Sequence, residues 1–302
     1  MGVSKRRVTG RLVQPGAELE RLASGFVCTE GPVWHPVRDC LLFSDIPAST
    51  RYRWSMTDGL EVDRQPTNKG NGMTLDAQCE LIICEHLTNA VVREHADGTR
   101  TVLASAYRGS ELNSPNDVVV KSDGAIYFTD PNYGRQDDVF GRLRACELDF
   151  QGVFRLSPDG ADLRMLVDDF EQPNGLCFSP DEQTLYVNDT PVGTIRAFQV
   201  EPDGSLGAER MLCEGIGTGD LAAGAVDGMK CDEEGNVYVT GPGGIWVITP
   251  DSEPLGVIEV PERALNLNWG GRDWADLCIA GEGSIYRLSM RVAGSLASYM
   301  AA

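Results

Sequence analysis

Short runs of apolar residues alternate with turn residues along the chain, and six of these runs end beside a small residue or a carboxylate. The runs cover residues 41–45, 82–86, 126–130, 185–189, 237–241 and 277–281. Runs of this length, rich in Val, Ile, Leu and Tyr and bounded by polar residues, predict β-strands. Their recurrence at intervals of roughly forty to sixty residues predicts a repeat architecture.

Turn residues divide each repeat into four strands. In the second repeat the strand segments cover residues 71–76, 81–86, 90–94 and 101–103, and Asp97-Gly98 marks one turn. Asp-Gly dipeptides between alternating segments favour hairpins, and helices longer than a turn or two are not expected. Four-stranded antiparallel units repeated around a ring form a β-propeller. The sequence therefore predicts an all-β, six-bladed β-propeller.

The ends of the chain suggest how this ring closes. Residues 19–27 are expected to complete the last blade, which protects the edges of the terminal sheet. The predicted organisation is an N-terminal extension (1–17), one propeller domain (18–290) and a C-terminal tail (291–302).

A polar residue precedes the end of each strand run by 14 or 15 positions. These residues are Glu30, Asn71, Asn116, Asn174, Asp227 and Asn266. The first strand of a propeller blade lies innermost, so residues at its start converge on one end of the central channel. The second strands return to the same face, and their final residues should surround the same opening: Asp45, His86, Asp130 and Asp189.

Converging carboxylate and amide oxygens suit a hard divalent cation, with calcium as the first expectation and magnesium or manganese as alternatives. Each residue also has a structural interpretation. Asn71 and Asn174 precede glycines and fit hairpin turns, while Glu30 and Asp227 fit solvated charges. Their shared register across the repeats favours the metal site.

The composition limits which classes of binding partner are expected. The net charge of −19 would repel nucleic acid and anionic membranes. No apolar stretch approaches the roughly 18 residues of a membrane span. Nine cysteines without a CxxC pair predict buried thiols in a reducing cytoplasm. The nucleophile-elbow motif G-x-S-x-G and the zinc motif H-E-x-x-H are absent from the sequence. A small molecule remains as the expected partner, and the oligomeric state stays open.

Six short motifs resemble the family of senescence marker protein 30, gluconolactonases and related bacterial sugar lactonases. They cover residues 30–34 (EGPVW), 71–72 (NG), 113–117 (NSPND), 127–131 (YFTDP), 173–176 (PNGL) and 227–229 (DGM). The resemblance covers about residues 18–290 and implies a six-bladed propeller with one catalytic divalent metal ion. It implies that Glu30, Asn174 and Asp227 bind the metal. It also implies that Asn116 contacts metal-bound water or substrate, or is itself a ligand.

Two features of the resemblance leave the details open. Animal members carry an Arg two positions before the residue equivalent to Asn116, whereas this chain has Ser114. The substrate preference of the animal enzymes is therefore not transferable. Family members also use calcium, zinc, magnesium, manganese or ferrous iron, so the resemblance does not identify the metal.

The function implied is hydrolysis of a sugar-acid lactone, an aldonolactone such as a glucono- or pentonolactone. A divalent cation would polarise the lactone carbonyl, and Asp227 is the candidate general base, unless the metal activates the water directly. The residues expected to contact the substrate are Asn71, His86, Asn116, Tyr133 and Arg135.

Residues 131–149 form a connection longer than a hairpin requires, and such a loop can cover an active site. It contains Tyr133, Arg135 and Arg142; either arginine could bind a substrate carboxylate or simply be solvated. His86 could bind a sugar hydroxyl, relay a proton or cap a strand end. Rival functions are phosphotriester or aryl-ester hydrolysis, or a non-enzymatic, metal-stabilised scaffold.

Overall fold

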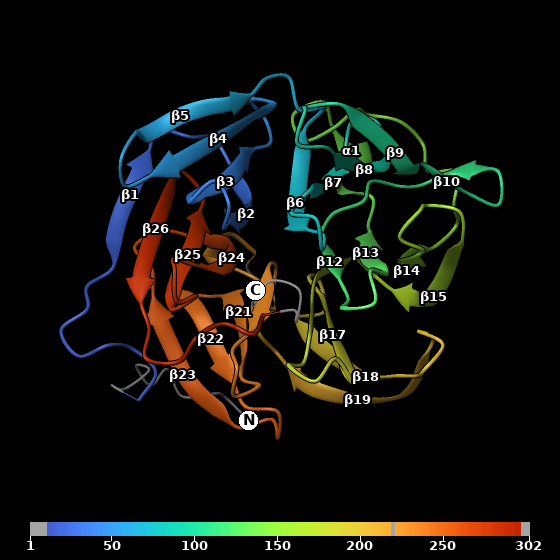
Figure 1. Cartoon of the computed structure of the whole chain (residues 1–302). Coiled ribbons are helices and arrows are strands. Elements are labelled where there is room, and N and C mark those ends of the chain that lie inside the picture. The colour runs from blue at the N-terminus through green and yellow to red at the C-terminus, as the bar shows by residue number, and fades with distance from the viewer. Residues whose placement is uncertain (1–10, 219–220, 297–302) are drawn as a thin grey trace.

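A ring of six four-stranded antiparallel sheets makes up the molecule (Figure 1). The computed structural model describes residues 11–218 and 221–296. In five sheets the strands follow one another in sequence order from the channel outward, and the sixth takes its outer strand from the N-terminal part of the chain. This confirms the predicted six-bladed β-propeller.

The blades consist of the following strands. Blade 1 contains β2 (Thr29–His35), β3 (Cys40–Asp45), β4 (Thr50–Ser55) and β5 (Gly59–Arg64); blade 2 contains β6 (Gly70–Leu75), β7 (Leu81–Glu85), β8 (Ala90–Glu94) and β9 (Arg100–Ala104). Blade 3 contains β12 (Val118–Val120), β13 (Ile126–Asp130), β14 (Gln151–Leu156) and β15 (Leu163–Phe170); blade 4 contains β16 (Pro173–Phe178), β17 (Thr184–Asp189), β18 (Thr194–Val200) and β19 (Leu206–Glu214). Blade 5 contains β20 (Met229–Cys231), β21 (Val237–Gly241), β22 (Gly244–Ile248) and β23 (Pro254–Glu259); blade 6 contains β24 (Ala264–Gly270), β25 (Asp276–Gly281), β26 (Ser284–Ser289) and β1 (Glu20–Ser24).

Other regular structure is short. Strands β10 (Ala106–Tyr107) and β11 (Ser110–Glu111) form a small hairpin. Among the described residues, the helical segments are α1 (Tyr133–Gln136) and the 3-10 turn η1 (Leu221–Ala223). Within that part of the chain, no helix has the length and apolar character needed to cross a membrane.

Strand β1 closes the ring as predicted. It pairs antiparallel with β26, from Glu20 opposite Arg287 to Ser24 opposite Ser284. Leu12, which is 1% exposed, packs in the core of blades 5 and 6 beside Val292. Residues 1–10 and 297–302, which include most of the expected extension and half of the expected tail, lie outside the described residues.

The apolar cores lie between neighbouring blades. Leu42 of blade 1 shares a cluster with Met73 and Ile83 of blade 2, and Phe128 stacks on Phe154 within the next core. Because each inner strand is covered on both faces, it reads as a nearly continuous apolar run. β3 is buried along its whole length, whereas β5 at the rim is not.

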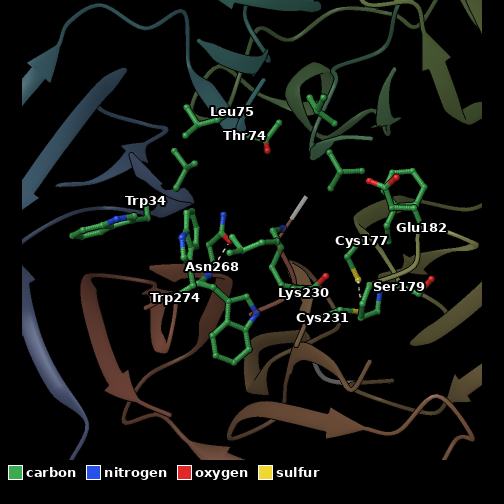
Figure 2. Close-up of a pocket in the computed structure, with 18 residues that line it drawn as sticks. Trp34, Thr74, Leu75, Cys177, Ser179, Glu182, Lys230, Cys231, Asn268 and Trp274 are labelled. Carbon is green, nitrogen blue, oxygen red and sulfur yellow. Dashed lines mark hydrogen bonds between the residues drawn. The ribbon is translucent and has the colours of Figure 1, made fainter. Parts of the chain in front are cut away.

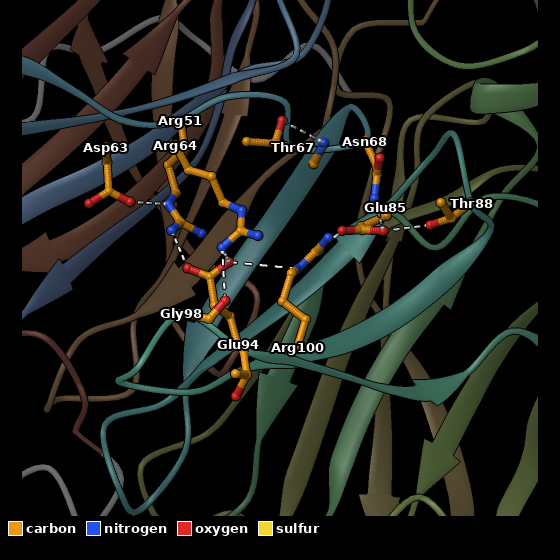
Figure 3. Close-up of polar contacts among 12 residues, drawn as sticks. Arg51, Asp63, Arg64, Thr67, Asn68, Glu85, Thr88, Glu94, Gly98 and Arg100 are labelled. Atoms are coloured by element: carbon orange, nitrogen blue, oxygen red, sulfur yellow. Dashed lines mark hydrogen bonds and ion pairs between the residues drawn. The ribbon is translucent and has the colours of Figure 1, made fainter.

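Buried charges also join blades 1 and 2 (Figure 3). Arg51 on β4 pairs with Asp63 on β5 at 2.6 Å and with Glu94 on β8. Arg64 also reaches Glu94, at 3.0 Å, and Arg100 on β9 pairs with Glu85. Burial, and secondarily the nearby arginines, lowers the pKa of Arg100 to about 10. The three arginines therefore depend on the carboxylates that surround them.

The innermost strands change register where they begin. The register shifts between Glu30 and Val33, and equivalent shifts occur near the starts of β6, β16 and β24. A β-bulge of this kind re-aims side chains. Glycine is required beside it: a Cβ on Gly31, whose φ is +53°, would lie 2.1 Å from the carbonyl oxygen of Asn71. The starts of the innermost strands of blades 1 and 2 therefore lie against each other.

Candidate functional site

A cavity of about 330 Å³ lies at the end of the channel where the innermost strands begin, and carboxylate and amide side chains line it. The starts of all six innermost strands line it, together with residues of the long connection after β13. Its ring residues are Glu30, Asn71, Asn116, Asn174, Asp227 and Leu265. Five of the six positions predicted from the sequence therefore meet around one space.

The sixth prediction is wrong by one residue. The amide of Gly228 donates to the carbonyl of Leu265 at 2.8 Å, as Gly72 donates to that of Asn116 at 2.9 Å. Leu265 therefore occupies the register of the ring. Asn266 lies behind it and donates from Nδ2 to Glu30 Oε2 at 2.8 Å. Counting from the strand end misplaced it because the hairpin of blade 6 is one residue longer: Gly270 pairs with Asp276, whereas in blade 1 His35 pairs with Cys40.

Glu30 is held by hydrogen bonds to one of its two carboxylate oxygens. Oε2 accepts from Asn266 and from the amide of Gly31 at 2.9 Å. Among the described residues no hydrogen bond reaches Oε1. Because the carboxylate is fixed through Oε2, Oε1 remains for a ligand in the cavity.

Asn174 and Asp227 are positioned by the backbones of blades 4 and 5. Asn174 Nδ2 donates to Thr190 Oγ1 at 3.0 Å, and Thr190 Oγ1 donates to the carbonyl of Val226 at 2.9 Å. Asn188 Nδ2 donates to the main-chain carbonyl of Asp227 at 2.6 Å. The amide nitrogen of Asn174 is thus engaged, so its Oδ1 is the atom left to bind a ligand.

Burial makes the two ring carboxylates costly to ionise. It raises the pKa of Glu30 to about 7, against smaller opposing effects from hydrogen bonds with Asn266 and Gly31. Burial, followed by repulsion from Glu30 and Asp117, raises the pKa of Asp227 well above its usual range. Two buried carboxylates that repel each other are stabilised as anions by a nearby cation.

The donor set fits a hard cation. Within the described residues, no three His, Cys, Asp or Glu side chains gather as metal ligands. A site here must therefore combine the two carboxylates with amide oxygens of the ring. All-oxygen ligands of this kind suit calcium, magnesium or manganese better than softer metals.

His86 lines the cavity at the opening, as predicted, but it is not the residue equivalent to the strand-end aspartates. Glu85 pairs with Gly70 as Asp45 pairs with Thr29, so Glu85 is the residue equivalent to the strand-end aspartates. His86 lies one residue further and lines the cavity, as Thr190 does after β17. Both of its ring nitrogens are engaged: Nε2 lies 3.0 Å from Asn71 Nδ2, and Nδ1 lies 3.0 Å from the carbonyl of Phe140.

The strand-end aspartates have a structural role. Asp45 accepts from the amides of Val27 and Cys28 at 3.0 and 3.2 Å. Asp130 and Asp189 each accept from two consecutive backbone amides in the same way, at 113–114 and 171–172. Each carboxylate fixes the segment that leads into its innermost strand, and none of the three lines the cavity.

The connection between β13 and β14 covers the cavity, with Tyr133, Gln136, Asp137 and Phe140 among its lining residues. The hydroxyl of Tyr133 is buried and has no hydrogen-bond partner among the described residues. Burial is the main cause that raises the pKa of Tyr133, so its hydroxyl keeps its proton and can donate to a ligand. Tyr133 is one of the residues for which a substrate contact was predicted.

The prediction for Arg135 is wrong. Its side chain is 3% exposed and does not line the cavity. The guanidinium donates to three main-chain carbonyls, those of Asn113, Leu112 and Ala145, and pairs with Glu111 at 3.0 Å. All of these partners belong to the loop or to the segment beneath it. Arg135 therefore anchors the covering loop and is not available to a substrate.

Outside the loop 131–149, three lining residues that the sequence did not predict carry a polar or ionisable side chain: Cys28, Thr190 and Arg263. Cys28 and Thr190 carry no motif, although Thr190 directly follows a predicted strand end. Arg263 is the one Arg or Lys among the lining residues; its Nη2 lies 3.0 Å from Glu282 Oε1, and its Nε is buried without a hydrogen-bond partner in the described structure. No pattern in the sequence distinguishes Arg263 from a solvated arginine.

The other end of the channel is mainly apolar, although Glu182, Lys230 and Asn268 also line it (Figure 2). Residues further along the same innermost strands line a pocket of about 110 Å³, with Trp34 and Trp274 on one side and Cys177 and Cys231 on another. The sulfur atoms of the two cysteines lie 3.6 Å apart. All nine cysteines are free thiols. The polar groups suited to chemistry are thus concentrated at the end that carries Glu30 and Asp227.

Comparison with known proteins identifies the family. Residues 28–282 match the model of the SMP-30/Gluconolactonase/LRE-like region. The gluconolactonase of Zymomonas mobilis is 32% identical over 296 residues, covering 91% of this chain and 82% of that relative. The pentonolactonase of Haloferax volcanii is 26% identical, covering 84% of this chain and 81% of its own length.

A solved structure is similar along nearly the whole chain. It is a gluconolactonase from Xanthomonas campestris, with a TM-score of 0.87, 34% sequence identity and coverage of 95% of both chains. The propeller, its polar ring and these relatives lead to one conclusion: the chain belongs to the SMP-30/gluconolactonase/LRE-like family.

Proposed function

We propose that this protein hydrolyses a sugar-acid lactone, an aldonolactone such as a glucono- or pentonolactone, to the free sugar acid with the help of one divalent metal ion. The named relatives are a gluconolactonase, a pentonolactonase and lactonohydrolases, and the chain is a lactonase of their kind. The observation that supports the mechanism is the meeting of Glu30, Asn174 and Asp227 at one polar cavity.

The metal would be held by Glu30, Asn174 and Asp227, with Asn116 as a further ligand or as a contact to substrate. Glu30 Oε1 and Asn174 Oδ1 are left over when their hydrogen bonds are assigned, and Asn116 lines the same cavity. When bound, a divalent cation supplies a Lewis acid that polarises the lactone carbonyl.

Asp227 is our candidate general base. Its carboxylate would take a proton from the water that attacks the carbonyl carbon. The same proton would then pass to the ring oxygen as the carbon–oxygen bond of the lactone breaks. In the metal-free site, burial and repulsion from Glu30 and Asp117 raise the pKa of Asp227. A bound cation would oppose that shift and keep the carboxylate ionised, which is the form that accepts a proton.

The remaining ring and loop residues would bind the sugar. Asn71 and Asn116 offer amide groups from blades 2 and 3, and Tyr133 offers a buried hydroxyl that lacks a partner among the described residues. Phe140 and Leu265 supply apolar surface. The covering loop excludes water from one side of the cavity, which strengthens the polar contacts within it.

The proposal is tested by assaying aldono- and aldarolactones with metal-free protein and after addition of calcium, magnesium, manganese, zinc or ferrous iron. Acid release is followed with a pH indicator against spontaneous opening, and a phosphotriester and an aryl ester serve as rival substrates. We expect metal-dependent opening of an aldonolactone. Faster hydrolysis of the rival esters, or no lactone opening with any metal, would overturn the proposal.

A further inference from the structure

His86 connects the covering loop to the polar ring through two hydrogen bonds. Nδ1 lies 3.0 Å from the carbonyl oxygen of Phe140, in the loop, and Nε2 lies 3.0 Å from Asn71 Nδ2, in the ring. The side chain is 2% exposed and lines the cavity. The two contacts together determine which ring nitrogen of His86 carries the hydrogen and how the amide group of Asn71 is oriented.

The carbonyl of Phe140 can only accept, so Nδ1 of His86 must carry the hydrogen. A neutral imidazole then has a lone pair on Nε2, which accepts from the amide nitrogen of Asn71. The reverse orientation of Asn71 would place its Oδ1 against that lone pair. Burial disfavours the doubly protonated ring that could donate to both partners, and lowers the pKa of His86 to about 4.

This arrangement leaves one group of Asn71 unsatisfied. Its Oδ1 is buried and accepts no hydrogen bond from the described residues. A buried acceptor without a donor is unfavourable, so a ligand that brings a donor recovers free energy there. Sugar lactones carry hydroxyl groups, which are such donors.

We propose that His86 is a positioning residue that fixes the amide of Asn71 with its Oδ1 as the acceptor for a hydroxyl group of the lactone. This proposal rests on the proposed function and deepens it, because it selects polyhydroxylated lactones. It also replaces the direct contact predicted for His86: the imidazole acts on the substrate through Asn71. Because His86 also bonds Phe140, this orientation of Asn71 requires the loop 131–149 to lie over the cavity.

The test uses the full chain loaded with its metal, glucono-δ-lactone as substrate, and three variants: His86→Leu, His86→Gln and Asn71→Leu. His86→Leu should raise KM about tenfold and leave kcat within about twofold, since one substrate hydrogen bond is lost. His86→Gln can accept from Asn71 and donate to Phe140, so it should restore most of the affinity. Asn71→Leu should match His86→Leu, and the double variant should lose no more than either single one.

His95→Leu is the matched control. His95 lies beyond β8 on the same blade, half-exposed, and bonds Glu80 and Thr101 away from the cavity. It should behave as wild type. Metal affinity should be unchanged in all variants, because Asn71 is not assigned to the metal.

Three results would overturn the proposal: additive losses in the double variant, an unchanged KM in both single variants, or weaker metal binding by Asn71→Leu. Its failure is distinguishable from failure of the proposed function. Wild-type protein that opens no lactone removes the function itself, whereas active wild type with an unchanged KM in the variants removes only this role of His86.

Discussion

At the scale of single residues, the site depends on which atom each side chain has left after its structural bonds are made. One carboxylate oxygen of Glu30 accepts a hydrogen bond from Asn266, and the amide nitrogen of Asn174 donates one to Thr190. The amide nitrogen of Asn71 likewise forms a hydrogen bond with His86. Each of these supporting residues thereby leaves an oxygen for a ligand, which is the atom that a hard cation or a sugar hydroxyl requires.

Asp227→Asn should reduce kcat at least about a thousandfold, because the amide neither accepts the water proton nor carries charge toward the cation. The change keeps the shape of the side chain and removes one of two carboxylates that repel each other, so the thermal stability of the metal-free protein should not fall. Lactone turnover by the purified variant is the measurement. Asp251→Asn, in an exposed turn, is the control and should keep wild-type activity. Activity within tenfold of wild type would exclude Asp227 as the base.

His86 should make stability depend on pH. Burial lowers its pKa in the folded protein from 6.5 to about 4. As pH falls below 6.5, the unfolded chain takes up a proton that the folded protein does not, so stability is lost between these two values and is unaffected above them. Between about pH 7.5 and pH 5 this group should cost about 2 kcal/mol.

Urea unfolding of wild type, His86→Gln and His95→Gln at both pH values measures this effect. The first variant should lose the His86 part of the slope, and the second should keep it. Equal slopes for wild type and His86→Gln would show that His86 does not titrate as described.

At the scale of elements, the loop 131–149 is held closed by its own buried arginine. Arg135→Met should leave three carbonyls and Glu111 without their donor, which loosens the loop over the cavity. We expect faster cleavage within residues 131–149 in limited proteolysis and a severalfold rise in KM. Arg142→Met, in an exposed part of the same loop, should do neither. Cleavage at the wild-type rate in Arg135→Met would contradict the anchoring role.

The charged contacts between blades 1 and 2 are the second element-scale feature with a testable cost. Glu94→Gln removes the carboxylate shared by Arg51 and Arg64 (Figure 3), and should lower the free energy of unfolding by about 3 kcal/mol. Chemical denaturation measures it. The exposed pair of Arg164 with Asp162 offers a control, since Asp162→Asn should cost less than about 1 kcal/mol. Equal losses of unfolding free energy in the two variants would show that burial does not increase the cost of breaking the ion pair.

At the scale of the whole molecule, the repeat made the fold predictable. Six strand runs and their turns determined the blade number, and the place of β1 followed from the need to close the ring. The site was predictable to the extent that the repeats share one register. It failed at Asn266, because the hairpin between β24 and β25 is one residue longer than that of blade 1, and at Arg135, because burial in a loop leaves no pattern in the sequence. Arg263 was missed because no pattern in the sequence distinguishes it from a solvated arginine.

The ring also joins distant parts of the chain. Glu30 comes from blade 1, Asn174 from blade 4 and Asp227 precedes the first strand of blade 5. A cation bound by all three would connect these blades and stabilise only the folded state.

Anomalous diffraction from a crystal of the protein grown with manganese is the most direct test of the proposed metal site. We expect one strong anomalous peak within roughly 2.0–2.6 Å of oxygens of Glu30, Asn174 and Asp227. If protein that opens lactones showed an anomalous peak elsewhere and none at this ring, Glu30, Asn174 and Asp227 would not be the metal ligands.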